Sequence, residues 1–170
     1  MKRFKRSIAI FLCVVMTLTA APLSGFVGLE LPSLFNFEAE AASYSGKCGD
    51  NLYWSLDTET GVLNITGTGA MESYKYSSEA KWYDYKDNIS SINIGNKVTS
   101  IGDWAFAHFY SLKNIDIPDS VTIIGNQAFY NCARLTNVSI GNSVATIGDA
   151  ALDCCYLLKS FNVDSGNKHY

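Results

Sequence analysis

The amino-acid sequence predicts a repeat solenoid of the α/β type, β-rich with short helical turns, in which similar coils stack on one another. One phrase occurs three times, as VTSIGDWAFAHF from Val98, VTIIGNQAFYNC from Val121 and VATIGDAALDCC from Val144. The three starting points follow a 23-residue period with no insertion. Neither a strand period nor a helix period runs through the phrase, and self-similarity at a fixed spacing marks repeat architectures. We therefore interpret each copy as part of one coil.

Residues 1–42 have the composition of a secretory signal peptide. The opening MKRFKR supplies four cations, the uncharged apolar run SIAIFLCVVMTLTAA follows, and a small-x-small cleavage signature, AEA, ends at Ala41. An N-terminal membrane anchor is the alternative, because residues 22–38 stay fairly apolar. A proline, a serine and a glycine interrupt that stretch, whereas a spanning helix needs roughly 20 continuous apolar residues. We expect cleavage, and a secreted or cell-surface chain with no membrane insertion afterwards.

Residues 43–88 are expected to form an N-terminal capping region. NLYWSL and VLNIT are short extended runs joined by Asp-Thr-Glu-Thr-Gly, which predicts a β-hairpin. The terminal coil of a solenoid exposes its apolar edge and needs a cover. Four aromatic residues offer large surfaces for this purpose: Trp54, Trp82, Tyr83 and Tyr85.

Residues 89–170 are expected to hold three full coils and a partial fourth. Each coil begins with a strand, as in LKNIDI, where Ile115 and Ile117 alternate with polar residues. The counterparts ISSINI, LTNVSI and LLKSFNV predict four parallel strands along one side of the stack. A second extended piece, V-x-x-I-G, then reaches a glycine corner. The following Ala-Phe segment predicts one short helical turn that places its Phe or Leu in the shared core.

The fourth unit stops at Tyr170, before its V-x-x-I-G piece. We therefore expect no C-terminal cap and a truncated array, either the start of a longer protein or a shortened gene product. Four apolar side chains are expected to face a missing neighbour: Leu157, Leu158, Phe161 and Val163. Leaving such side chains in water forfeits about 1.5 to 3 kcal/mol each.

The repeats resemble the BspA-type leucine-rich repeat (LRR), a family of bacterial surface and secreted proteins, in IPDSVTIIGNQAFYNCARLTNVSI and SVATIGDAALDCC. Upstream, CGDNLYWSLDTETGVLNITGTGAM is similar to the segment that commonly precedes such arrays. Departures are local, since Leu152 stands where the pattern has Phe, and His108-Phe109 where it has Asn-Cys. The resemblance implies recognition of proteins or cell surfaces in adhesion, with no common catalytic residues.

Catalytic and cofactor signatures are not apparent, so we expect no enzyme, cofactor or metal. The sequence has no HExxH, GxSxG, Walker loop or paired CxxC motif, and His108 and His169 are expected to be surface or packing residues. Residues 43–170 carry 9 Lys and Arg against 13 Asp and Glu, a formal charge near −4. This mildly acidic balance without a basic run argues against nucleic acid and anionic lipid as partners.

Four cysteines follow residue 42, and an exported chain permits disulfides between them. Cys132 and Cys155 occupy the same column of adjacent coils, with Cys154 beside the second, while Cys48 lies in the capping region. One interpretation is small buried thiols. The other is a bridge from Cys132 to Cys154 or Cys155, if the coils approach within about 7 Å. Three sulfurs without a fourth ligand do not favour zinc.

The candidate ligand-binding surface is the solvent face of the four strands. Its twelve positions are all polar: Ser90, Ser91, Asn93, Lys113, Asn114, Asp116, Thr136, Asn137, Ser139, Lys159, Ser160 and Asn162. Any solvated sheet face requires polar residues, so plain solvation is the alternative. The functional interpretation is a shallow hydrogen-bonding platform for a protein or a glycan. Because it lacks the aromatic anchors of tight interfaces, we expect weak, multivalent binding.

Three roles are compatible with this organisation. The favoured one is a secreted or surface-displayed binding and adhesion module. The second is a passive structural spacer, and the third is the accessory region of a longer extracellular enzyme whose catalytic domain lies outside this chain. A fold alone cannot name the ligand.

Overall fold

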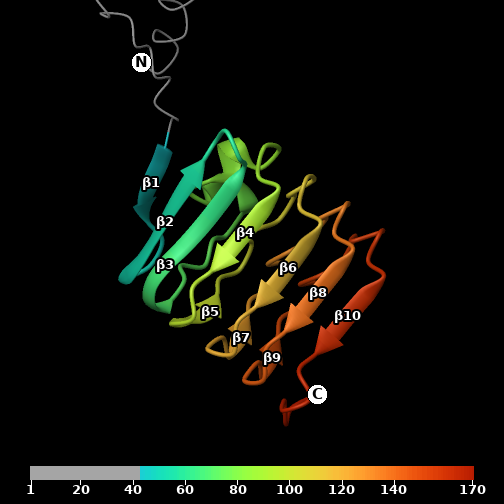
Figure 1. The fold of residues 1–170 in the computed structure, drawn as a ribbon. Helices are drawn as coiled ribbons and strands as arrows, with labels where there is room; N and C mark the ends of the chain where they lie inside the picture. Colours follow the sequence, from blue (N-terminus) through green and yellow to red (C-terminus); the bar gives the residue numbers. More distant parts are fainter. Residues whose placement is uncertain (1–42) are drawn as a thin grey trace, which may run out of the picture. The chain divides into compact units, whose positions relative to one another are not determined.

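The structure is a computed structural model that describes residues 43–170, so the signal peptide expected in residues 1–42 lies outside the described residues. The described chain forms strands β1 to β10 and two short 3-10 helices, η1 (Ser77–Glu79) and η2 (Tyr83–Tyr85). Strands of the repeat lie side by side along the stack (Figure 1).

The chain begins with a three-stranded antiparallel sheet made of β1 (Ser43–Lys47), β2 (Asn51–Asp57) and β3 (Val62–Ala70). The predicted hairpin is confirmed as β2 and β3, and β1 adds a strand that the sequence pattern did not predict. Asp57 closes the turn, because its Oδ1 accepts the backbone N–H groups of Thr60 (3.1 Å) and Glu59 (2.9 Å). These hydrogen bonds, the one from Thr60 first, lower the pKa of the Asp57 carboxyl.

Strand β3 joins this sheet to the first coil by pairing with two of its strands. Its first half, residues 62–65, pairs in parallel with β4 (Ser91–Ile94). Its last two residues pair in parallel with β5 (Val98–Ile101), across a register shift between Gly69 and Ala70. One long strand therefore supplies backbone partners to two strands of the coil that follows.

The later coils stack in two parallel sheets. The front wall contains β6 (Asn114–Ile117), β8 (Asn137–Ile140) and β10 (Ser160–Val163). The rear wall continues from β5 to β7 (Ile123–Ile124) and β9 (Thr146–Ile147). In the front wall Ile115 lies opposite Val138, which lies opposite Phe161, so equivalent positions of successive coils face one another.

The expectation that all four repeat strands form one sheet is wrong for β4. This strand lies beside β6 in Figure 1, but the three-stranded front sheet contains only β6, β8 and β10. All four residues of β4 pair with β3 instead. Strand β4 is therefore hydrogen-bonded to the N-terminal sheet, although it lies in the row of repeat strands.

The expected short helical turns are also wrong, since the described chain after η2 contains strands and turns but no helix. Six non-glycine residues of these turns have φ between 49° and 67°: Trp104, His108, Gln127, Asn131, Ala150 and Cys154. A left-handed residue every fourth position breaks the α-helical hydrogen-bond pattern. The backbone turns outward as a result, and the N–H of Phe106 donates to the carbonyl of Ala128 in the next coil (2.8 Å).

This third side of the stack is therefore a ladder between coils. The N–H of Phe129 donates to the carbonyl of Ala151, and the N–H groups two residues before and two residues after each of these donors also bond to carbonyls of the next coil. Left-handed residues cost roughly 1 to 2 kcal/mol each. The ladder offsets that cost, because backbone groups beside the core would otherwise lack partners.

Columns of equivalent apolar residues fill the space between the three sides. Phe106 stacks on Phe129 with ring centroids 5.4 Å apart. Trp82 also stacks on Phe106, with centroids 5.3 Å apart. All three side chains are buried. Leu112 and Leu135 form a second fully buried column. Each coil thus buries apolar surface that no single coil could bury alone.

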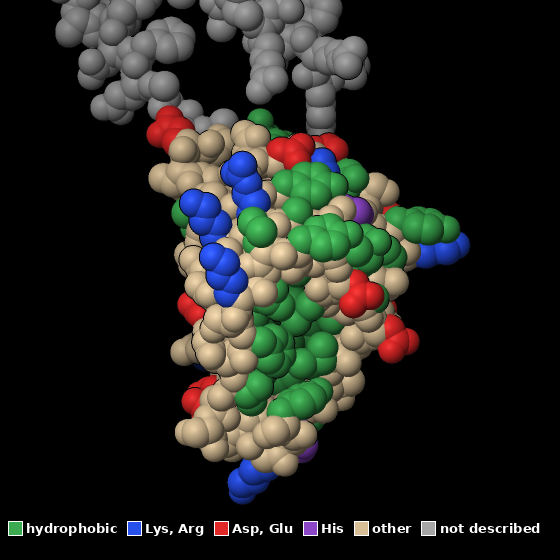
Figure 2. All heavy atoms as spheres, turned by 90° about the vertical axis from the view of Figure 1, so that its right-hand side faces the viewer, with side chains coloured by type: hydrophobic (Ala, Val, Ile, Leu, Met, Phe, Trp, Pro, Cys, Tyr) green, Lys and Arg blue, Asp and Glu red, His purple; other side chains and the backbone are tan. Residues whose placement is uncertain are grey.

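The C-terminal end of the stack exposes apolar side chains, as the sequence predicts. Figure 2 looks at this end and shows hydrophobic side chains gathered in its middle. Leu157 is 50% and Phe161 43% exposed, while Leu158 and Val163 are partly buried. The counterparts of Leu158, Phe161 and Val163 one coil earlier, Leu135, Val138 and Ile140, are buried.

Candidate binding surfaces

The twelve residues of the predicted platform lie on β4 and on the three strands of the front wall, or immediately before these strands. None of them is buried. The residues that alternate with them, such as Ile115 and Val138, point into the core. The structure therefore brings the predicted positions together on one side of the stack, and their role in binding a ligand remains a prediction. We call this surface the polar sheet face.

Side-chain amides form ladders across the polar sheet face. Asn137 donates through Nδ2 to Oδ1 of Asn114 over 2.8 Å, and Asn93 donates to Oδ1 of Asn64 on β3, also over 2.8 Å. Within the last strand Asn162 donates to the hydroxyl of Ser160 (2.8 Å). Because these side chains are already held, a ligand would immobilise fewer rotamers on binding.

Charges on the polar sheet face are not neutralised within the described chain. The two ion pairs among residues 43–170 join Lys81 to Glu72 and Lys86 to Asp87, away from this face. Lys113, Asp116 and Lys159 are exposed and have no ion-pair partner there. The face thus offers both signs of charge between rows of neutral donors and acceptors.

A second surface, on the turn side of the stack, was not predicted from the sequence. Four rings form a continuous edge-to-face chain that we call the aromatic cluster: Trp104, Tyr130, His108 and Tyr110. Successive ring centroids are 5.8, 5.6 and 6.0 Å apart. All four side chains are at least partly exposed.

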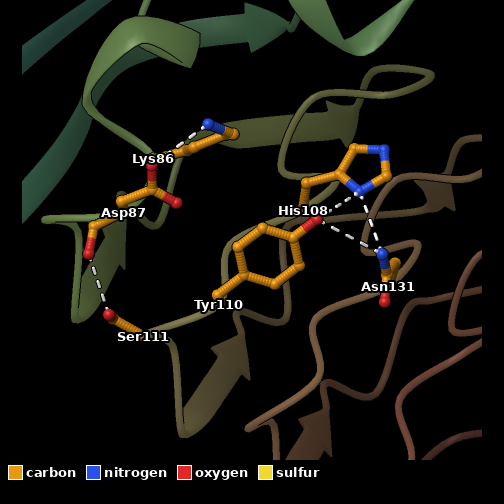
Figure 3. A network of polar contacts seen from close by, with 6 residues as sticks. All are labelled: Lys86, Asp87, His108, Tyr110, Ser111 and Asn131. Atoms are coloured by element: carbon orange, nitrogen blue, oxygen red, sulfur yellow. Dashed lines mark hydrogen bonds and ion pairs between the residues drawn. The ribbon is translucent and has the colours of Figure 1, made fainter.

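Asn131 ties the polar edge of this cluster together (Figure 3). Its Nδ2 lies 3.1 Å from Nδ1 of His108 and 3.4 Å from the hydroxyl of Tyr110, which is itself 3.3 Å from the same ring nitrogen. Burial, with a further contribution from the charge of Lys86, lowers the pKa of His108 below its ordinary value. The imidazole is therefore neutral at pH 7.

The sequence signal for the aromatic cluster is weak for a geometric reason. Trp104 and Tyr130 belong to different columns of the repeat, so the periodicity of the sequence does not place them together. The available signal was the departure from the repeat at His108, where the neighbouring coil has Asn131. Such a departure indicates that the side chain at that position does not follow the packing shared by the other coils.

The cysteines at residues 48, 132, 154 and 155 are free thiols. Cys132 and Cys155 donate through Sγ to the carbonyls of Phe106 and Phe129, over 3.2 and 3.3 Å. The interpretation as buried thiols is therefore confirmed for Cys132 and Cys155, whereas Cys154 is only partly buried, and the alternative, a bridge from Cys132 to Cys154 or Cys155, is not present. Burial raises the pKa of Cys48 to about 12.

Residues 43–170 contain no group of three or more His, Cys, Asp or Glu side chains that could hold a metal ion. Within the same range, no helix has the length and apolar character that crossing a membrane requires.

Residues 78–170, which make up more than half of the chain, match the family described as BspA type leucine rich repeat region (6 copies). No curated protein matches the chain. The structure is similar to a leucine-rich repeat protein from Eubacterium ventriosum, with 24% identity and a TM-score of 0.50, over 75% of this chain and 45% of that one. This likeness shows a leucine-rich-repeat fold.

Two further solved structures also match. A leucine rich cell surface protein from Faecalibacterium prausnitzii is 20% identical, with a TM-score of 0.49, over 69% of this chain and 39% of that one. A leucine-rich repeat protein from Bacteroides ovatus is 32% identical, with a TM-score of 0.43, over 44% of this chain and 20% of that one. The chain spans less than half the length of each of these solved proteins.

Proposed function

The chain belongs to the BspA-type leucine-rich-repeat family, and from this premise we propose that it is a binding and adhesion module that acts outside the cell and not an enzyme. The observation that carries the proposal is the polar sheet face. Twelve polar side chains, none of them buried, lie on one side of the stack, and the register of the repeat aligns those of β6, β8 and β10. A repeat stack offers such an extended surface because each coil adds one strand to it.

The ligand of the polar sheet face is a protein or a glycan. Asn, Ser and Thr side chains donate and accept hydrogen bonds, which suits sugar hydroxyls and peptide groups equally. The amide ladder between Asn114 and Asn137 supports the proposal, because it fixes donors and acceptors before a ligand arrives. Single contacts of this kind are weak, so affinity should rise with the number of coils or copies engaged.

Replacing three central residues of the face tests the proposal. The purified chain would be screened against an array of extracellular proteins and glycans, and each hit measured by biolayer interferometry. We expect the triple variant of Asn114, Asp116 and Asn137 to alanine to weaken a genuine hit by at least about tenfold, since several hydrogen bonds to charged and neutral groups disappear together.

A matched control comes from the rear wall. Lys97, Thr99 and Thr146 are exposed there, and their replacement by alanine should leave binding unchanged. A front-wall variant that binds as tightly as the wild type would instead make the array a passive spacer.

Export is part of the proposed function. It is supported by the cations, the apolar run and the AEA signature within residues 1–42. Mass spectrometry of the protein made by its own cells should find a mature N-terminus close to Ala42. Intact chains beginning at Met1 in the cytosolic fraction would refute export.

A further inference from the structure

The aromatic cluster on the turn side has the shape of a receptor for a cation. Tyr130 lies between Trp104 and His108, at interplanar angles of 64° and 84°. Rings at these angles meet edge to face and do not stack on one another. The faces of aromatic rings carry negative potential, so partly exposed rings attract positively charged groups.

The rings are held in place before any partner arrives. Ala107, the counterpart of Tyr130 one coil earlier, is small and buried. Trp104 and His108 both have left-handed backbone, which fixes where their side chains leave the turn. Asn131 holds the edges of His108 and Tyr110, as Figure 3 shows. A partner would therefore lose little free energy in ordering this surface.

Charge around the aromatic cluster also favours a cation. The three turn segments, residues 103–112, 126–135 and 149–158, carry three aspartates, Asp103, Asp149 and Asp153, against the single cation Arg134. Asp153 occupies the column of Tyr130 one coil later and is exposed, and its carbonyl accepts the N–H of Asn131, the residue after Tyr130, over 2.8 Å. Lys86, near His108, is already paired with Asp87 at 3.3 Å.

We infer that the aromatic cluster binds an arginine or lysine side chain from an extended basic segment of a partner protein. The cation lies against the faces of Tyr130 and Trp104, and the carboxylate of Asp153 balances its charge. Tyr156, which is 77% exposed, extends the surface into the third coil. Tyr, Trp and Arg are the residues that most often anchor protein interfaces. This surface is separate from the polar sheet face, which lacks aromatic residues, and the inference goes beyond the proposed function.

The chain carries its own reporter for this site. Of its three tryptophans, Trp54 and Trp82 are buried and Trp104 alone is partly exposed. A cation seated on the cluster should change the fluorescence of Trp104 and leave the other two indoles unaffected. Saturable quenching by a peptide can therefore be assigned to one ring.

The probe is a hexapeptide of alternating glycine and arginine, titrated into the full chain at low ionic strength. The matched control replaces arginine with citrulline, which has the same shape and no charge. We expect the arginine peptide to bind saturably and the citrulline peptide about tenfold more weakly, because the cation–π and carboxylate contacts both require charge. Added salt should weaken only the arginine peptide.

Four variants localise the effect. Tyr130→Ala and Asp153→Asn should each weaken the arginine peptide several-fold, whereas Tyr53→Ala, at an exposed ring on β2, should not. Tyr130→Phe keeps the ring and should bind like the wild type, which separates loss of the site from loss of fold. Equal binding of the citrulline peptide, or unchanged affinity in folded Tyr130→Ala and Asp153→Asn, would overturn the inference.

An uncharged oligosaccharide, maltohexaose, is the competing probe. If maltohexaose quenches the fluorescence of Trp104 and the arginine peptide does not, the cluster binds sugar rings and the inference is wrong. Failure of this site is distinguishable from failure of the polar sheet face, because the alanine variant of Asn114, Asp116 and Asn137 leaves the aromatic cluster intact.

Discussion

The indole nitrogen of Trp82 donates a hydrogen bond of 2.7 Å to the carbonyl oxygen of Ala105, and its ring stacks on Phe106 at 5.3 Å. The same two contacts recur between coils. Phe106 stacks on Phe129, and its N–H donates to the carbonyl of Ala128. One side chain of the N-terminal region therefore provides the first coil with the hydrogen bond and the ring that a preceding coil would provide.

Replacing Trp82 with phenylalanine tests this relationship. A ring remains to stack, but the buried carbonyl of Ala105 loses its donor, so we expect the free energy of unfolding to fall by about 1 to 3 kcal/mol. Chemical denaturation followed by circular dichroism measures the loss. Trp104→Phe is the control, because the Trp104 indole nitrogen has no hydrogen-bond partner within residues 43–170. Equal effects of the two variants would show that the Trp82 hydrogen bond contributes nothing.

Gly61 is expected to resist substitution for two reasons. It has φ of 69°, and an added Cβ would run into the carbonyl oxygen of Asn88. Gly69 has φ of 109° but nothing within 4 Å of such a Cβ. Both alanine variants carry a backbone penalty of about 1 kcal/mol or more. Gly61→Ala should lower the melting temperature further, and an equal loss in Gly69→Ala would contradict the clash with Asn88.

Acid should destabilise the chain through His108. Its pKa in the folded state is lowered, while the unfolded value is near 6.5. Between these two values the unfolded chain binds a proton that the folded chain does not, so stability falls as the pH drops below about 6.5. The groups around the ring are Lys86, Tyr110, Tyr130 and Asn131.

His108→Asn should flatten this pH dependence. Asparagine occupies the same column one coil later, as Asn131, and tolerates the left-handed backbone. Denaturation midpoints measured from pH 7.5 to 5 should decline less in His108→Asn than in the wild type. His169→Asn, at an exposed residue near the C-terminus, is the control and should decline as the wild type does. Identical slopes in all three proteins would exclude His108 as the source.

The parts of the fold that depend on the period of the repeat could be predicted from the sequence. The columns through Ile115, Val138 and Phe161 follow from the spacing alone, because paired strands of equal coils must share a register. The third side could not be predicted in the same way. Its left-handed positions hold Trp104, Gln127 and Ala150, which have no preference for that backbone. The inter-coil hydrogen bonds impose it, and they exist only once the coils have stacked.

The two candidate surfaces differ in the same respect. The polar sheet face follows from strand alternation, so its residues could be named from the sequence. The aromatic cluster depends on a contact between different columns of the repeat, Trp104 of one coil against Tyr130 of the next. Side-chain contacts between unlike columns leave no period in the sequence, so only the folded structure reveals them.

Lysine footprinting tests the proposed binding face most directly. It is carried out on the chain bound to a partner found by screening extracellular proteins and glycans. Lys113 and Lys159 lie on the polar sheet face, whereas Lys97 precedes β5 on the rear wall, and all three are exposed. After acetylation with and without the partner, mass spectrometry reports the reactivity of each residue. We expect the partner to protect Lys113 and Lys159 and leave Lys97 reactive. Protection of Lys97 with undiminished reactivity at Lys113 and Lys159 would contradict binding through the polar sheet face.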